Sequence, residues 1–331
     1  MTGSARELPP AIFLMGPTAT GKTDLALSLA DQLPLEIISV DSALIYRGMD
    51  IGTAKPDPEV LARWPHRMID IRDAAEPFSV ADFVVEATQH MQSIVERGHI
   101  PLLVGGTMMY FRALLEGLAD IPPIAIEIRH QIEQQADHDG WPALHRELMQ
   151  IDPETAQRLH PNHSRRIQRA LEVYRGTGKT LSHYRAEQIR KGGIGLPINE
   201  YFQVVQLALL PANRQYLHQR IAERFQSMLQ QGFENEVRTL FERGDLTAEL
   251  PALRAVGYRQ MWQYLAGDLD YDQMADKGIA ATRQLAKRQL TWLRNWSELN
   301  RIFIDQDNGK PKIKQLLLEE TLNILREYTI Y

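Results

Sequence analysis

The sequence predicts an α/β protein in which a parallel sheet is flanked by helices and interrupted by an all-helical insertion. Within the first 120 residues, short apolar runs alternate with helical patterns. A glycine-rich loop separates the first apolar run from the first helical pattern. From residue 121 to residue 196 the patterns become helical, polar and strongly charged. We therefore expect a discontinuous core domain, residues 1–120 and 197–331, and a helical domain of residues 121–196.

The glycine-rich loop, residues 16–23, reads Gly-Pro-Thr-Ala-Thr-Gly-Lys-Thr and lies between a predicted strand, 11–15, and a predicted helix, 24–33. It fits G-x-x-x-x-G-K-[ST], the P-loop pattern, in which backbone amides surround a phosphate, the lysine adds positive charge and the last hydroxyl can hold Mg²⁺. A surface turn with an exposed lysine is the alternative. The flanking strand and helix favour a phosphate-binding loop in a P-loop NTPase-like sheet, without showing whose phosphates it binds.

Asp41 follows the second predicted strand, residues 35–40. In doubly wound sheets, ligands bind beyond the carboxyl ends of the strands. If the first two strands lie near each other, the Asp41 carboxylate should face the same crevice as the phosphate-binding loop. An aspartate that only forms a turn is the alternative, because Asp-Ser pairs also begin turns.

A third apolar strand, residues 100–104, runs into Gly105-Gly-Thr107. Phosphate-hydrolysing P-loop enzymes usually carry an aspartate at the end of such a strand to help hold Mg²⁺. Here the loop offers close backbone approach and the Thr107 hydroxyl, but no charge. In the preceding loop, residues 46–56, Arg47 and Lys55 could either reach phosphates or be solvated.

Further elements follow in chain order. A helix is expected at 80–97, and insertion helices at 126–139, 141–150, 153–160 and 164–174. The strand pattern of residues 202–210 returns the chain to the sheet, and helices are expected at 213–231, 233–243, 259–265 and 279–296. An edge strand, 301–304, and a closing helix, 312–326, complete the prediction.

Charge is distributed unevenly along the chain. The net charge is −5, yet residues 157–179 carry +5 and residues 277–296 carry a further +5. In the second of these basic islands, Arg283, Lys287 and Arg294 share one helical face and no acid is present. A solvated basic face is the default interpretation of such a helix. The lack of acidic partners favours contact with nucleic acid.

Composition limits the compartment and the site chemistry. The absence of cysteine excludes disulfides and thiolate metal sites. No apolar run approaches the ~20 residues of a membrane span, and the first ten residues lack the apolar centre of a signal peptide. We expect a cytoplasmic protein that does not insert into membranes.

Five segments together resemble the bacterial tRNA dimethylallyltransferase family. They are the loop 16–23, Asp41-Ser-Ala-Leu-Ile-Tyr-Arg47, Asp50-Ile-Gly-Thr-Ala-Lys-Pro56, Gly105-Gly-Thr107 and Ala280-Ala-Thr-Arg-Gln-Leu-Ala-Lys-Arg-Gln-Leu-Thr-Trp292. The resemblance runs from about residue 11 to about residue 300. It implies an enzyme that transfers a dimethylallyl group from dimethylallyl diphosphate to N6 of the adenosine 3′ to the tRNA anticodon (position 37), releasing diphosphate.

The resemblance also implies site residues. Asp41 becomes the candidate catalytic base, with Thr107 as a second contact to the amine or the base. The diphosphate ligands would be Gly16, Pro17, Thr18, Ala19, Thr20, Gly21, Lys22, Thr23 and Arg220, with Thr23 holding a Mg²⁺ cofactor. The anticodon stem-loop would contact Asp41, Ser42, Ala43, Leu44, Thr107, Arg129, Arg165, Arg166, Ile167, Gln168, Arg169, Leu250, Pro251, Ala252, Leu253, Arg254, Ala255, Arg283, Gln284, Leu285, Ala286, Lys287, Arg288, Gln289 and Leu290. Tyr258 and His163 are candidates for stacking on a flipped base, and a monomer is expected.

Two other functions are compatible with the loop. A nucleotide-dependent small-molecule kinase would use it for ATP, although it would need neither basic island and would usually carry the missing acid after Val104. An RNA-binding NTPase switch would use the basic islands without group transfer.

Overall fold

The structure is a computed structural model that describes residues 8–119, 121–191, 196–306 and 308–330. The first seven residues of the N-terminal stretch considered above lie outside the described part. Backbone contacts divide the chain into a core unit, Met1–Leu115 with Ile198–Tyr331, and an insertion unit, Glu116–Pro197. The insertion thus begins at Glu116, rather than at residue 121.

The core unit contains a six-stranded parallel sheet in the order β3-β2-β4-β1-β5-β6. This arrangement confirms the predicted fold class. Ile12 in the central strand pairs with Leu102 on one side and Val205 on the other. The two-residue β3 was not predicted, whereas the edge position of β6 was. The strands are β1 Pro10–Met15, β2 Leu35–Val40, β3 His66–Arg67, β4 Ile100–Gly105, β5 Gln203–Leu210 and β6 Asn300–Phe303.

Helices cover both faces of the sheet. Ile12 and Leu14 of β1 share a buried cluster with α1 (Lys22–Ala30) and α14 (Lys314–Glu327). Because side chains alternate along a strand, Phe13 faces the other side. There its ring lies 5.0 Å from that of Phe111 in α4 (Met108–Glu116), while Phe83 of α3 (Val80–Glu96) stacks on Tyr110. Neither α4 nor the short α2 (Pro58–Arg63) was predicted.

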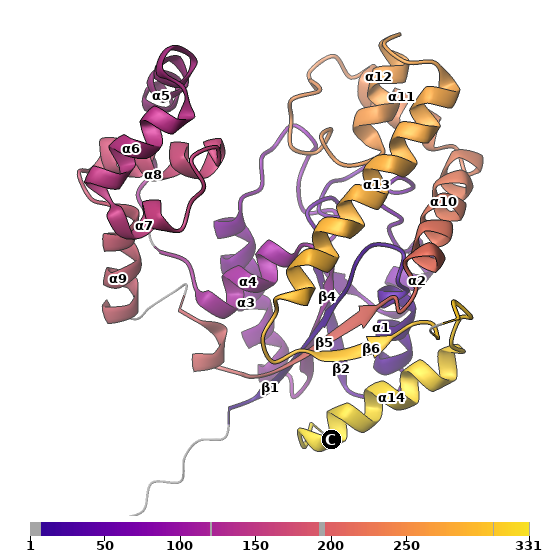
Figure 1. The fold of residues 1–331 in the computed structure, drawn as a ribbon. Helices are drawn as coiled ribbons and strands as arrows, with labels where there is room; N and C mark the ends of the chain where they lie inside the picture. Colours follow the sequence, from indigo (N-terminus) through magenta and orange to yellow (C-terminus); the bar gives the residue numbers. More distant parts are fainter. Residues whose placement is uncertain (1–7, 120, 192–195, 307, 331) are drawn as a thin grey trace, which may run out of the picture. The chain divides into compact units, whose positions relative to one another are not determined.

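A second buried cluster joins four later helices to the segment after β2. These helices are α10 (Arg214–Gln230), α11 (Phe233–Phe241), α12 (Tyr258–Leu265) and α13 (Tyr271–Arg294), of which α11, α12 and part of α13 lie together above the sheet in Figure 1. Their buried side chains include Phe225, Phe233, Val237, Tyr258 and Met274, and they pack with Ile45, Tyr46 and Met49. The segment after β2 is therefore held by core packing.

Helix α13 begins at Tyr271, eight residues before the predicted start at 279. Asp270 accepts a hydrogen bond from the Gln273 amide at 2.8 Å, and the Gln273 side chain accepts one from the Asp270 amide at 3.3 Å. This reciprocal capping box satisfies two helix-end donors. The capping box therefore places the start of α13 before the basic segment from which this helix was predicted.

The regular elements in the described residues of the insertion unit are all helices, joined by turns and loops. It consists of α5 (Ile126–Asp139), α6 (Trp141–Ile151), α7 (Pro153–Gln157), α8 (Ser164–Thr177) and α9 (Leu181–Lys191). Its core includes the fully buried Ile132, Leu144, Leu148, Ile167 and Leu171. Helix α9 was not predicted. A 3₁₀ turn, Ile198–Glu200, precedes β5 in the core unit.

None of the helices in the described ranges is long and apolar enough to cross a membrane.

Glu36 links four segments of the sheet region through its side-chain contacts. These contacts predict that the free energy of unfolding depends on pH. Glu36 accepts hydrogen bonds from Arg97 at 2.8 and 3.0 Å and contacts His99 and Arg67. The Arg97 hydrogen bond, above all, lowers the pKa of Glu36 to about 2 from 4.5. A lowered carboxyl pKa adds stability above the unfolded-state pKa, and that stability is lost as pH falls toward the folded-state value.

We therefore expect Glu36→Gln to lower the unfolding free energy at neutral pH by about 1 kcal/mol, as for other partly exposed ion-pair networks. The difference from the unsubstituted protein should shrink as pH is lowered through 4.5 toward 2. Urea unfolding at several pH values measures this. A difference that stays constant with pH would show that charge on Glu36 contributes nothing.

Candidate active site

A cavity of about 660 Å³ opens at the carboxyl ends of the central strands, entirely within the core unit. Strand β4 lies between β1 and β2, so the residues that follow these three strands meet at one edge of the sheet. Helices α10 and α13 complete the wall. The structure thus brings together the predicted Lys22, Thr23, Asp41 and Thr107, with Arg224 from α10.

The phosphate-binding loop is shaped by close backbone approaches. A Cβ at Gly16 would lie 2.7 Å from the Leu209 carbonyl oxygen of β5. Gly21 has φ +86°, a left-handed conformation that favours glycine, and α1 begins at the next residue. The Lys22 Nζ donates to the Pro17 carbonyl at 2.7 Å. Lys22 and Thr23 line the cavity at the start of α1, where helix amides lack intrahelical partners.

Three cations gather at this end of the cavity. The Arg220 Nε donates to the Ala19 carbonyl at 2.8 Å, and an Arg224 Nη donates to the Thr53 carbonyl at 3.2 Å. Burial, and then the charge of Arg224, lower the pKa of Lys22 to about 7, against the opposing effect of Asp41. Burial also lowers the pKa of Arg224. Positive charges held together against their mutual repulsion form a site suited to a polyanion.

Arg224 was not predicted as a site residue. Its only signal in the sequence was its position four residues after Arg220, on the same row of one helix.

Asp41 both forms a turn and faces the cavity. Its Oδ1 accepts the amides of Ala43 at 2.8 Å and Leu44 at 3.4 Å. Its Oδ2 accepts no hydrogen bond from any residue that the structure describes. Beside it, the Thr107 Oγ1 accepts the Ser42 amide at 3.1 Å. One oxygen therefore fixes the carboxylate while the other is available to a ligand.

Gln289, expected as a tRNA contact, lines the cavity and also bridges two loops. Its Oε1 accepts the Thr18 amide at 3.0 Å, and its Nε2 donates to the Gly106 carbonyl at 2.9 Å. A Cβ at Gly106 would lie 2.4 Å from that Nε2, so the glycine is needed for the bridge. The buried Gln289 side chain thus joins the phosphate-binding loop to the loop after β4.

The residues expected to contact tRNA separate into exposed and buried side chains. Exposed ones include Arg165, Arg166, Arg169, Pro251, Arg254, Gln284, Lys287 and Arg288. The side chains of Ile167, Gln168, Ala252, Leu253 and Ala286 are instead buried, which corrects the expectation that they face RNA. Apolar side chains on the inner face of an amphipathic helix or turn pack into the core, even where the surrounding segment is basic.

Part of the first basic island is paired internally. The buried Glu172 accepts Arg129 at 2.9 Å and lies 3.6 Å from Arg169. Arg175 pairs with Glu147 of α6 at 2.7 Å. Glu172 is the one acid inside residues 157–179, whereas Glu147 comes from another helix, which a count along one segment could not include. Arg165 and Arg166 remain exposed.

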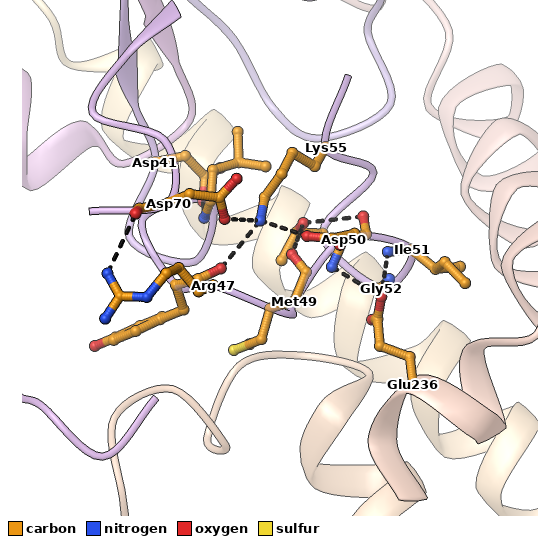
Figure 2. Close-up of polar contacts among 12 residues, drawn as sticks. Asp41, Arg47, Met49, Asp50, Ile51, Gly52, Lys55, Asp70 and Glu236 are labelled. Atoms are coloured by element: carbon orange, nitrogen blue, oxygen red, sulfur yellow. Dashed lines mark hydrogen bonds and ion pairs between the residues drawn. The ribbon is translucent and has the colours of Figure 1, made fainter. Parts of the chain in front are cut away.

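Lys55 and Tyr258 have structural roles. The Lys55 side chain, 4% exposed, contacts Asp50 and Asp70 at 2.5 Å each and donates to the Tyr46 carbonyl at 3.0 Å (Figure 2). Lys55 is thus an internal ion-pair partner, which differs from both roles considered for it in the sequence, phosphate contact and solvation. Tyr258 is fully buried, with its ring nearly perpendicular to that of Phe233, so no ring face is open for base stacking. His163 is exposed, and its ring accepts the His160 amide at 3.1 Å.

The fold and the cavity define a P-loop-type protein whose phosphate-binding end adjoins a strand-end carboxylate. The family model described as IPP transferase matches residues 44–296, and the chain belongs to this family.

Similar proteins include tRNA dimethylallyltransferase 2 from Hahella chejuensis, 55% identical over 310 residues that cover 91% of this chain and 92% of that protein. Among solved structures, the full-length tRNA isopentenylpyrophosphate transferase from Bacillus halodurans is 35% identical, with a TM-score of 0.66 and coverage of 97% and 98%. A eukaryotic dimethylallyltransferase acting on tRNA is 25% identical, with a TM-score of 0.77 over 96% of this chain and 78% of that chain.

The lowered pKa of Lys22, about 7, predicts proton uptake when a polyanion binds. At pH 8 the free amine is mostly neutral, and a bound anion beside it should restore the charge. Calorimetry with inorganic diphosphate in buffers of different ionisation enthalpy should detect close to one proton taken up per site. Lys22→Met should abolish this uptake. Equal uptake by both proteins would place the titrating group elsewhere.

Proposed function

We propose that the protein transfers a dimethylallyl group from dimethylallyl diphosphate to tRNA and releases diphosphate. The observation that carries the proposal is the shared cavity at one edge of the sheet, which Asp41, Lys22 and Arg224 line, with Arg220 next to Arg224 and bound to the phosphate-binding loop. The relatives named above act on tRNA, and membership of the IPP transferase family supports the same reaction here.

The proposed acceptor is N6 of the adenosine 3′ to the anticodon. This amine is a poor nucleophile because its lone pair is delocalised into the ring. A carboxylate that accepts its N–H can orient the amine and take the proton while the C–N bond forms. Asp41 suits this role because Ala43 and Leu44 fix its Oδ1 and its Oδ2 is free to accept. The adjoining Thr107 hydroxyl can make a second contact.

At the other end of the cavity, diphosphate leaves the allylic carbon and gains charge as the C–O bond breaks. Donors placed beforehand at developing charge make the largest contribution to rate in many enzymes. Lys22, the loop amides, Arg220 and Arg224 would supply them, and their mutual repulsion would decrease as negative charge builds up.

We propose Mg²⁺ as the cofactor, entering with the diphosphate. Thr23 lines the cavity at the start of α1 and offers a hydroxyl oxygen. The residues that the structure describes include no group of three or more His, Cys, Asp or Glu side chains that could hold a metal ion. This fits Mg²⁺, which keeps several waters and is bound largely through substrate phosphates. When bound, Mg²⁺ would neutralise charge on the leaving group.

For tRNA, we propose that the anticodon stem-loop lies against the exposed arginines and lysines of the two basic islands. The target base must leave its stack to reach Asp41, which costs a few kcal/mol and less in a loop than in a duplex. A monomeric state and a cytoplasmic location remain predictions.

Mass spectrometry of tRNA nucleosides tests the transfer directly. With Mg²⁺ and dimethylallyl diphosphate, adenosine should gain one dimethylallyl group. ATP hydrolysis or phosphoryl transfer, with no gain of mass on tRNA, would instead support a P-loop kinase or an NTPase switch.

Asp41→Asn should lower kcat by about 10²–10⁴-fold, the usual contribution of a general base. Asparagine keeps an oxygen for the turn amides but cannot accept the proton. Binding of unmodified tRNA should change little, which filter binding can measure. Unchanged turnover would refute the assignment of Asp41 as base.

Arg166→Gln and Lys287→Gln, one exposed residue in each basic island, should each weaken tRNA binding. Each should also reduce the slope of log K against log salt by about one for each lost phosphate contact. Arg301→Gln, an exposed arginine of β6 outside both islands, is the charge-matched control. A salt slope unchanged from that of the control would make these residues solvated charges only.

A further inference from the structure

Glu236 of α11 holds the segment between the two ends of the site. Its Oε2 accepts the amides of Asp50 at 2.8 Å and Ile51 at 2.6 Å, and its Oε1 accepts the amide of Gly52 at 3.1 Å. Figure 2 shows the carboxylate reaching from its helix to these consecutive amides. The Tyr258 hydroxyl donates to the same Oε1 at 2.5 Å. Such a row of amides forms a binding site for an anion, and here a side chain of the protein fills it.

The segment 49–55 is rigid on further grounds. Lys55 closes it by binding Asp50, Asp70 and the Tyr46 carbonyl. The Lys55 amide donates to the Asp50 carbonyl at 2.9 Å. A Cβ on Gly52 would lie 2.1 Å from the Phe233 ring and 2.6 Å from that of Tyr258, so the backbone packs directly on aromatic side chains.

This segment forms part of the cavity. Gly52, Thr53 and Ala54 line its wall, next to Arg224. The Thr53 carbonyl accepts the Arg224 guanidinium at 3.2 Å. Arg224 in turn is close enough to Lys22 and Asp41 for their charges to act on one another. An unbroken chain of contacts therefore runs from Glu236, through segment 49–55, to the cation cluster.

We propose that Glu236 is a positioning residue for the transfer reaction, which fixes segment 49–55 so that Thr53 orients Arg224 toward the diphosphate end of the cavity. The inference deepens the proposed function and rests on it. Burial and the neighbouring Glu236 raise the pKa of Tyr258, so its hydroxyl stays a donor to the carboxylate.

A carboxylate is required because four donors converge on its two oxygens. Glutamine has the same shape but one oxygen, and its NH₂ group can only donate. In Glu236→Gln, either the amides of Asp50 and Ile51 or the amide of Gly52 and the Tyr258 hydroxyl lose their acceptor. Donors left without an acceptor destabilise the closed segment locally.

The test compares the full-length protein with Glu236→Gln. Hydrogen exchange measured by mass spectrometry should rise at residues 50–52. The dissociation constant for inorganic diphosphate with Mg²⁺ should rise about tenfold, corresponding to one or two lost hydrogen bonds. KM for dimethylallyl diphosphate should rise similarly, while KM for tRNA stays within twofold. Glu234→Gln is the matched control, since Glu234 lies on the same helix and pairs with Arg238 at 2.6 Å.

A double-mutant cycle separates positioning from general destabilisation. In an Arg224→Gln background, Glu236→Gln should have less than a twofold further effect on diphosphate binding, because both changes act through the same guanidinium. Additive effects of the two substitutions would overturn the proposal. Unchanged diphosphate binding in Glu236→Gln, at equal thermal stability, would overturn it as well.

The diphosphate and exchange measurements need no turnover. If the unsubstituted protein failed to prenylate tRNA while Glu236→Gln still weakened diphosphate binding through Arg224, the proposed acceptor chemistry would fail and the positioning role would stand.

Discussion

The burial of Lys22 and Arg224 beside each other, with Arg220 next to Arg224, is the constraint on which the site depends. Burial and the neighbouring Arg224 lower the pKa of Lys22 to about 7, and Asp41 only partly opposes them. A protein keeps such a cluster only if the surrounding backbone holds each cation in place. Here the Pro17, Ala19 and Thr53 carbonyls accept one cation each. An incoming diphosphate would relieve the repulsion, and that relief would grow as charge develops on a leaving group.

Those carbonyls lie on two segments, the phosphate-binding loop for Pro17 and Ala19 and segment 49–55 for Thr53, and each is fixed by different packing. Gly16 brings the phosphate-binding loop against β5, and Gln289 ties that loop to the one after β4. Segment 49–55 packs against the buried cluster around Phe233, and Glu236 accepts hydrogen bonds from its backbone amides. The segments after β5 therefore help to shape both ends of the cavity.

Much of the sheet could be predicted because its strands are short apolar runs bounded by turn residues, as at Leu35–Val40. The phosphate-binding loop and Asp41 were predictable because a local pattern places both at strand ends. Helix α4 was missed although Thr107, a residue type favoured at helix N-caps, directly precedes it, and β3 was missed because two residues carry no periodicity. The roles of Lys55, Gln289 and Glu236 depend on partners 15, 271 and 186 positions away. The spacing of residues within a short segment cannot predict such contacts.

In the proposed reaction, the phosphate-binding loop binds the leaving diphosphate. A carbon–oxygen bond therefore breaks, rather than a phosphorus–oxygen bond. Dimethylallyl diphosphate labelled with ¹⁸O at the oxygen that bridges carbon and phosphorus would decide this in one reaction with tRNA. All of the label should appear in the released diphosphate, in step with prenylated adenosine. Label retained in an organic product, or diphosphate released without modification of tRNA, would contradict it.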